Sequence, residues 1–439
     1  MISRAVIEGA LRPSATLGDV TFMYTFMMRI TRPLAVLLML SASIATLAAS
    51  PSSAIYEVHY RAEVRPTDKS IHVEIKLSGD KLPRKLVFTI DPKRQRSFVS
   101  TDKLEQTGAT VTWYPQGRFS RLNYDFVINH ERSPGRYDSL ITQDWALLRA
   151  DKMIPRVKVT AIRKLHSHAT LEFVLPAQWT AVTAYPATTA GHWLIDDPER
   201  RFDRPAGWML LGKLGKRSEI IADVQTIVAA PAGNNARRQD VLAFLNWNLP
   251  HVIEVFPNFP RRLLVASAGD PMWRGGLSGP SSVFVHSDRP LISENRTSTL
   301  LHELVHVAMG IRGDEESDWI VEGFAEYYSV ETLRRSGGIG KQRYDEALRR
   351  LTRWAQRTTS LFDKSSSGAT TARAVIALKA ADDEIRTATR GKASLDDVAR
   401  ELAATGGEVN LERLQTLAAK VAGRPVAALD RTALSQPLK

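Results

Sequence analysis

The sequence of 439 residues contains no cysteine. This absence excludes disulfide-linked scaffolds, thiolate zinc fingers, iron–sulfur clusters and cysteine nucleophiles. We therefore expect any bound metal ion to take its ligands from histidine and carboxylate side chains. The chain has ten histidines from which such a site could be built.

Internal repeats and low-complexity runs are also missing. With 44% hydrophobic and 24% charged residues, the composition is that of a globular protein, and it excludes the disordered, collagen-like and polytopic membrane classes. A chain of this length is long enough for two or three domains, each with its own core.

The net charge of +12 and the isoelectric point of about 9.8 raise the possibility of a nucleic-acid or anionic-surface binder. However, Lys and Arg are interleaved with Asp and Glu along the chain, and no aromatic or glycine-rich nucleic-acid motif accompanies them. We therefore expect no nucleic-acid partner. Association of an exported basic protein with an anionic cell envelope accounts for the charge.

The first 54 residues have the features of a targeting segment. Arg29 and Arg32 precede an uncharged stretch at 33–49, which small residues follow. This order is typical of a secretory signal peptide, so we expect a periplasmic or secreted protein with no integral membrane domain after cleavage. The alternative is a membrane anchor formed by residues 33–53.

Two domains are expected after the signal peptide. In residues 55–215, apolar side chains alternate with polar ones, as Ile71, Val73, Ile75 and Leu77 do, which predicts an antiparallel β-sandwich. A stretch rich in Pro and Gly at 196–215 marks the boundary. In residues 216–439, short strands give way to helices, so the fold class is α+β.

A candidate metal site begins at the sequence HELVH. His302 and His306 are four residues apart, so on a helix their side chains project from the same face and can bind one ion. Residues 293–309 contain neither Pro nor Gly, and Gly310 follows as a helix stop. The alternative is a pair of ordinary surface or core histidines.

A third ligand is available on the next predicted helix, which begins at Ser317 or Asp318. Glu322 lies sixteen residues after His306 among apolar neighbours, where a carboxylate would be costly unless it met a cation. Glu326 is one turn further and could accept the ring N–H of a ligand histidine. Tyr327 and Tyr328 are expected to be packing residues.

HELVH followed by WIVEGFAEYY resembles the gluzincin metallopeptidases, and in particular the glycyl aminopeptidase family. Gly275, Gly276 and Leu277 before the first helix, and the segments ADDEIR and SLDD at 381–386 and 394–397, are similar to that family as well. The resemblance implies a thermolysin-like catalytic domain and a peptide or protein substrate. It also implies one zinc ion held by His302, His306 and Glu322, which activates water with Glu303 as general base.

The sequence departs from that family at two positions. Ser278 stands where the family has a glutamate that captures the substrate's amine, and Thr371 stands where it has a tyrosine that donates to the oxyanion. Tyr344, the only later tyrosine, does not match that motif. These departures keep open an alternative function, a zinc-binding but weakly active or non-catalytic protein that binds peptides or envelope polymers. We also expect the strand at 281–287 to be an edge on which a peptide pairs.

Overall fold

The computed structural model describes residues 54–189, 191–195, 201–358, 360–436 and 438. They belong to one compact unit that extends over residues 53–439. The predicted signal peptide and the alternative anchor at 33–53 lie outside the described residues, apart from residue 54 at the end of the signal segment. Within the described ranges, no helix combines the length and the apolar character that crossing a membrane requires.

The N-terminal part is built from long strands that alternate as predicted. In β2 the side chains of Ile71, Val73, Ile75 and Leu77 are all buried on one face. The described residues form a seven-stranded sheet in the following order: β14 (Ala187–Thr189), β15 (His192–Ile195), β12 (Leu165–Val174), β1 (Ala54–Arg65), β2 (Ser70–Ser78), β7 (Phe119–Val127) and β4 (Gln95–Ser100).

Two smaller sheets share a core with it. Buried side chains of β1 and β2 pack with Phe88 and Trp113 of the first small sheet and with Leu148 and Met209 of the second. The first, in the part of the chain described, comprises β11 (Arg156–Thr160), β3 (Lys85–Thr89), β6 (Thr110–Tyr114) and β5 (Lys103–Thr107). The second comprises β13 (Thr180–Val182), β16 (Trp208–Gly212), β10 (Trp145–Arg149), β9 (Arg136–Ile141) and β8 (His130–Ser133), with helix α1 (Ala150–Met153) after β10.

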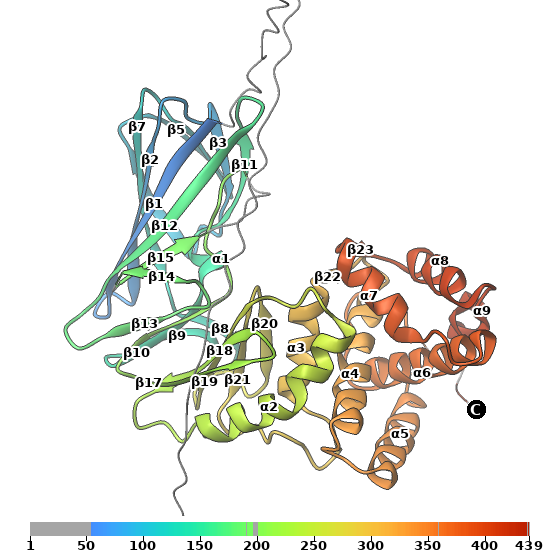
Figure 1. Ribbon diagram of the computed structural model, residues 1–439. Coiled ribbons are helices and arrows are strands. Elements are labelled where there is room, and N and C mark those ends of the chain that lie inside the picture. Colours follow the sequence, from blue (N-terminus) through green and yellow to red (C-terminus); the bar gives the residue numbers. More distant parts are fainter. Residues whose placement is uncertain (1–53, 190, 196–200, 359, 437, 439) are drawn as a thin grey trace, which may run out of the picture. The chain divides into compact units, whose positions relative to one another are not determined.

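One feature of the predicted antiparallel sandwich is wrong. Strands β1 and β12 are neighbours and run parallel, with Ala54 opposite Leu165 and Glu63 opposite Val174, and Figure 1 shows them side by side along the long sheet. Period-two alternation reports which face of a strand is buried but carries no information about direction. A strand pair separated by about a hundred residues of sequence can therefore be parallel without any local signal.

The next sheet carries the strand that borders the candidate site. Its order over the described residues is β17 (Leu214–Ile221), β18 (Val224–Pro231), β19 (Arg262–Ala268), β21 (Ser282–His286) and β20 (Gly276–Gly279). The three inner strands are parallel, and β20 is antiparallel to β21. Helix α2 (Arg238–Val255) connects β18 to β19. The expectation that residues 281–287 form the edge is wrong, because β20 takes the edge.

The chain passes from β16 in one sheet to β17 in the next through Lys213, close to the predicted boundary between residues 215 and 216. Trp208 and Leu210 of β16 pack against Leu264 and Phe284 of the following sheet, so the two sheets share a core of their own. The division into domains at 55–215 and 216–439 stays a prediction.

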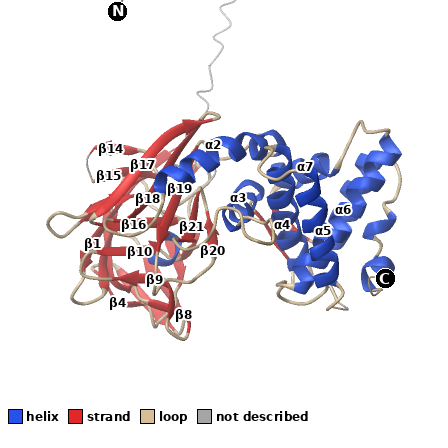
Figure 2. Ribbon diagram, turned by 90° about the horizontal axis from the view of Figure 1, so that it is seen from below, coloured by secondary structure: helices blue, strands red, loops and turns tan. Residues whose placement is uncertain are grey.

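The rest of the described chain is mainly helical, and Figure 2 shows strands and helices gathered in separate regions. The helices bury one large apolar core that also includes Val265 and Val283 of the last sheet. They are α3 (Thr299–Met309), α4 (Asp318–Arg335), α5 (Lys341–Ala355), α6 (Ala369–Thr389), α7 (Leu395–Thr405), α8 (Leu411–Ala422), a 3₁₀ turn (Ala427–Leu429) and α9 (Arg431–Ser435).

Candidate metal centre

The helix that carries both histidines is bounded by two local signals. The hydroxyl of Ser298 accepts a hydrogen bond from the Leu301 N–H and so caps the start of α3. Gly310 ends the helix in the left-handed conformation, with φ of 58°, which glycine adopts without strain. The prediction that Gly310 ends this helix is confirmed.

The second helix is held against the first by a reciprocal contact that the sequence does not reveal. The Ser298 N–H donates to the hydroxyl of Ser329 on α4, and that hydroxyl donates back to the Ser298 carbonyl, both at 3.1 Å. Both serines are buried. Two small polar residues 31 positions apart give no signal in a single sequence, because each alone reads as an ordinary cap or helix residue.

The segment between the two helices includes a short strand. Residues Ile311–Gly313 form strand β22, which pairs in parallel with β23 (Gly407–Val409). Further along, the carboxylate of Asp318 accepts the N–H of Ser366. The start of α4 is therefore fixed by parts of the chain that come much later in the sequence.

This pair of helices brings His302, His306 and Glu322 together. One carboxylate oxygen of Glu322 lies 3.2 Å from Nε2 of His302, and the other lies 3.4 Å from Nε2 of His306. The two Nε2 atoms are 3.2 Å apart, and the potential ligand atoms of the three residues all lie within 4.8 Å of one another. Two imidazoles and one carboxylate converging on one point can hold a metal ion.

Glu326 lies on the far side of His302 from this point. Its carboxylate is 3.0 Å from Nδ1 of His302, which is the geometry expected from the sequence. A proton on Nδ1 that is donated to Glu326 leaves the lone pair of Nε2 directed toward Glu322 and His306.

The charges within the cluster are strongly coupled. Burial lowers the pKa of His302, but hydrogen bonds with Glu322 and Glu326 outweigh burial and raise it to about 10. Burial raises the pKa of Glu322, but its contacts with His302 and His306 hold that pKa well below the usual range. The cluster therefore favours a positive charge at its centre, which a proton on His302 or a bound metal ion can supply.

Glu303 is buried next to the edge strand β20. A Cβ atom placed on Gly276 would lie 2.6 Å from Cγ of Glu303 and 2.7 Å from Cγ2 of Thr299. Only glycine at position 276 lets β20 approach α3 this closely. The Gly-Gly-Leu segment noted in the sequence thus has a physical reason, since it brings the edge strand β20 up to the carboxylate of Glu303.

The tyrosines near the cluster are occupied elsewhere. The phenol of Tyr328 donates to Asp396 on α7 at 3.0 Å, and Tyr327 is buried beside it. Tyr344 packs at the start of α5 against Arg334, which follows Glu322 by twelve residues on α4, or roughly 18 Å along a helix. Thr371 lies on α6, with its hydroxyl 3.2 Å from that of Ser366. None of these contacts supplies the oxyanion donor.

No family model and no curated protein matches the sequence. Solved structures do match. An aminopeptidase N family protein from Idiomarina loihiensis has a TM-score of 0.61 at 14% identity, over 79% of this chain and 70% of that one. The M1 zinc metallopeptidase from Deinococcus radiodurans has a TM-score of 0.55 at 16% identity, over 88% of this chain and 94% of that one.

The chain has the fold of the M1 zinc metallopeptidases. Yeast LTA4 hydrolase also matches, with a TM-score of 0.55 at 12% identity, over 88% of this chain and 68% of that one. M1 enzymes are gluzincins, so the resemblance inferred from HELVH and WIVEGFAEYY is confirmed at the level of the fold. The mixed α+β class is confirmed in the same way.

Proposed function

We propose that this protein is a zinc metallopeptidase that hydrolyses peptide bonds, with Glu303 as the general base. The observation that carries the proposal is the position of Glu303, which follows His302 directly and lies beside the strand edge of β20. A thermolysin-like arrangement of this half of the chain belongs to the same proposal. It is supported by the antiparallel edge strand and by the packing of α3 against both β20 and α4.

His302, His306 and Glu322 would hold one zinc ion. Two imidazoles and a carboxylate are the ligand set of many hydrolytic zinc sites, which keep a fourth position for water. When bound, zinc supplies Lewis acidity: it lowers the pKa of a water molecule and polarises a carbonyl. Glu326 would keep His302 in the tautomer that presents Nε2 to the ion.

Glu303 would move the protons of the reaction. Its carboxylate takes a proton from the attacking water and passes that proton to the amine that leaves. The close approach of β20 restricts the space around Glu303. The edge strand β20 would pair with an extended peptide, backbone to backbone, beside the Ser278 carbonyl that Arg149 already contacts, and place the scissile bond near Glu303.

The cleavage position is not expected to depend on a free amino terminus. Position 278 supplies a hydroxyl group, and the charged side chain that contacts this residue is a cation: Arg149 donates to the Ser278 carbonyl at 3.1 Å. A guanidinium offers no attraction to a substrate ammonium group. We therefore propose that internal peptide bonds are substrates.

The alternative is a zinc-bearing peptide or envelope binder with little or no activity. It is favoured by the contacts of Tyr328, Tyr344 and Thr371, since loss of an oxyanion donor costs about two to three orders of magnitude in rate. Export and the association with an anionic envelope remain part of the proposal, supported by residues 1–54 and the net charge of +12.

Mass-spectrometric profiling of a defined peptide library tests the proposal. We expect the zinc-loaded wild type to cleave peptides at internal bonds, and the Glu303→Gln variant to bind zinc without cleaving. Cleavage only at amino termini would contradict the inference from Ser278. Absence of all cleavage with zinc bound would favour the binding protein.

A further inference from the structure

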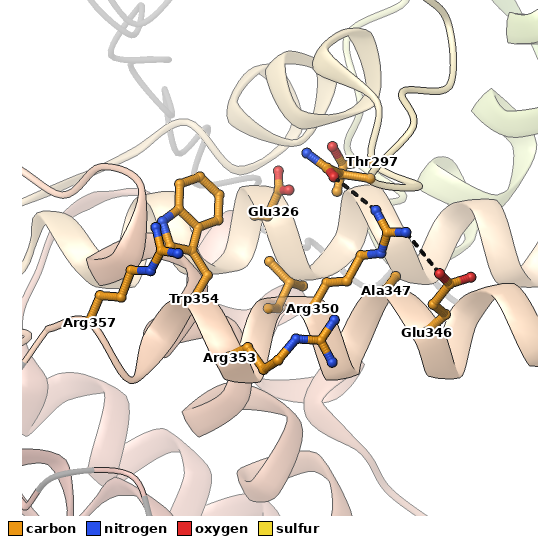
Figure 3. A pocket seen from close by; sticks show the side chains of 10 residues that line it. Thr297, Glu326, Glu346, Ala347, Arg350, Arg353, Trp354 and Arg357 are labelled. Atoms are coloured by element: carbon orange, nitrogen blue, oxygen red, sulfur yellow. Dashed lines mark hydrogen bonds and ion pairs between the residues drawn. The ribbon is translucent and has the colours of Figure 1, made fainter.

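A cavity of about 520 Å³ has Glu326, a direct neighbour of the metal cluster, in its lining. It is bordered by Asn295 and Thr297, which precede α3, by Glu326 on α4, and by one face of α5 with the residues just after it. Figure 3 shows Glu326 directed into the space between Thr297 and Trp354. This volume is within the range of pockets that hold small ligands or side chains. Because Glu326 also contacts His302, the cavity adjoins the proposed catalytic site.

Three arginines line the cavity: Arg350, Arg353 and Arg357. Arg350 and Arg353 lie three residues apart on α5, and Arg357 follows two residues after the helix ends, so the spacing keeps all three on one side. Arg350 donates to Glu346 at 2.9 Å. Among the described residues, neither Arg353 nor Arg357 has a carboxylate within ion-pair distance, although both are exposed enough to meet a ligand.

The two carboxylates of the lining are already engaged. Glu346 contacts Arg350 and also Arg296, at 3.1 Å, and the hydrogen bond from Arg350 lowers the pKa of Glu346. Glu326 contacts the ring of His302. The guanidinium groups of Arg353 and Arg357 therefore keep their charge uncompensated within the cavity wall. Guanidinium groups bind carboxylates in a two-pronged geometry that an amide cannot reproduce.

We propose that this cavity is a substrate subsite that binds a carboxylate of the peptide. The inference rests on the proposed peptidase function and names its substrate preference. Trp354 is 43% exposed and lines the same cavity, so its ring offers an apolar surface to the carbon chain that carries the carboxylate. The carboxylate comes either from an Asp or Glu side chain or from the free carboxyl terminus of the peptide.

Matched synthetic peptides test the subsite. The first pair differs only by Glu or Gln at one position, which is scanned across the residues flanking the cleaved bond. The second pair shares a sequence without acidic side chains and ends in a free carboxylate or an amide. In one of the two kinds of pair, we expect kcat/KM to be roughly tenfold or more higher for the peptide that carries the carboxylate than for its amide counterpart. This ratio corresponds to the free energy of a hydrogen bond to a charged group.

The double variant Arg353→Gln/Arg357→Gln should reduce that ratio to near one, because it removes the uncompensated cations. Arg343→Gln is the matched control: Arg343 is an exposed arginine of the same helix that does not line the cavity, and its removal should leave the ratio unchanged. A carboxylate bound directly to the metal would keep its preference in the double variant, and that result would overturn the proposal.

The same peptides are also titrated into the zinc-loaded Glu303→Gln variant by calorimetry, where hydrolysis plays no part. Tighter binding of the Glu peptide than of the Gln peptide identifies a side-chain carboxylate as the ligand of the subsite. Tighter binding of the free carboxylate than of the amide identifies the carboxyl terminus. Equal affinity for acidic and neutral peptides overturns the subsite. Cleavage without any charge preference leaves the peptidase function standing, whereas a binding preference without cleavage supports the subsite and contradicts the peptidase.

Discussion

The carboxylate of Glu322 faces both histidines, with one oxygen near each Nε2 atom. Replacing Glu322 by Ala should therefore weaken zinc binding by more than the roughly 10–100-fold that loss of an outer hydrogen-bond partner costs. Metal content of the purified protein and competition with a chromophoric chelator measure the change. Glu315→Ala is the control, because Glu315 is exposed just before α4. Unchanged zinc content in Glu322→Ala would contradict the assignment.

Gly276 controls the space around Glu303. A methyl group at this position would meet Glu303 Oε1 at 2.9 Å and Cγ at 2.6 Å. We expect Gly276→Ala to displace Glu303 and to lower kcat/KM about 100-fold, as small misplacements of catalytic groups do, while zinc binding is retained. Gly340→Ala, at a glycine with open space around it, serves as control. Wild-type activity in Gly276→Ala would show that the approach of β20 has no catalytic consequence.

At the scale of elements, Gly323 sets how closely α4 and α6 pack. A Cβ atom there would lie 2.7 Å from Cβ of Ala374 and 3.2 Å from Cδ1 of Leu378. We expect Gly323→Ala to lower the free energy of unfolding by about 1–3 kcal/mol through overpacking, despite the higher helix propensity of Ala. Urea denaturation measures this. Adding Ala374→Gly should restore part of the loss, and a Gly323→Ala variant as stable as wild type would refute the close contact.

The C-terminal end of α4 is held by a buried charge network. Burial raises the pKa of Glu331, but hydrogen bonds from Arg334 and Arg335 outweigh burial and lower that pKa below its ordinary value of 4.5. Arg335 also donates to both oxygens of Asp396 on α7, at 2.8 and 2.9 Å. The ionised form of Glu331 is therefore favoured in the folded state.

The stabilisation from Glu331 is present above the ordinary pKa and is lost as the pH falls through the lowered value. Glu331→Gln should cost roughly 1–3 kcal/mol of unfolding free energy at pH 7, and its difference from wild type should shrink from pH 4.5 downward. Urea denaturation at pH 7, 4 and 3 checks both expectations, with Glu315→Gln as control. A difference that stays constant with pH would mean that the charge of Glu331 has no part in the effect.

Helices were the elements that the sequence predicted best. The spacing of His302 and His306, the helix start at Ser317 or Asp318 and the stop at Gly310 are local signals, and α3 and α4 follow them. The edge strand was misplaced because residues 281–287 have the stronger β pattern, whereas β20 contains two glycines and becomes the edge only through the sheet order. Strand order and direction depend on distant partners, which no local pattern encodes.

The candidate site likewise combines local features that the sequence predicts with distant contacts that it does not. Helix periodicity places His302 with His306 on one face of α3 and Glu322 with Glu326 on one face of α4, whereas distant contacts such as Ser298–Ser329 hold the two helices together. The cavity arginines give no distinct signal in the sequence, because Arg350, Arg353 and Arg357 lie in and just after a densely charged helix, where they resemble a solvated face. The contact between Ser298 and Ser329 likewise became visible only in three dimensions.

At the scale of the whole molecule, the described chain joins a β-rich N-terminal part, a mixed sheet and a helical C-terminal part. The mixed sheet packs against both other parts. It shares one apolar core with Trp208 of the β-rich part, and its own Val265 belongs to the core of the helices. The edge of that sheet and the helix pair α3–α4 together define the site. Export and the periplasmic or secreted location of the protein stay predictions, because they rest on residues 1–54 and on the net charge of +12.

The central claim is that zinc held by His302, His306 and Glu322 works with Glu303 to hydrolyse peptides. The most direct test is a zinc titration of metal-free protein, with peptide hydrolysis and bound metal recorded together. We predict that wild-type activity rises from zero and saturates at one ion per chain, while Glu303→Gln binds zinc equally and stays inactive. Hydrolysis that is independent of zinc, or full activity in Glu303→Gln, would contradict the account.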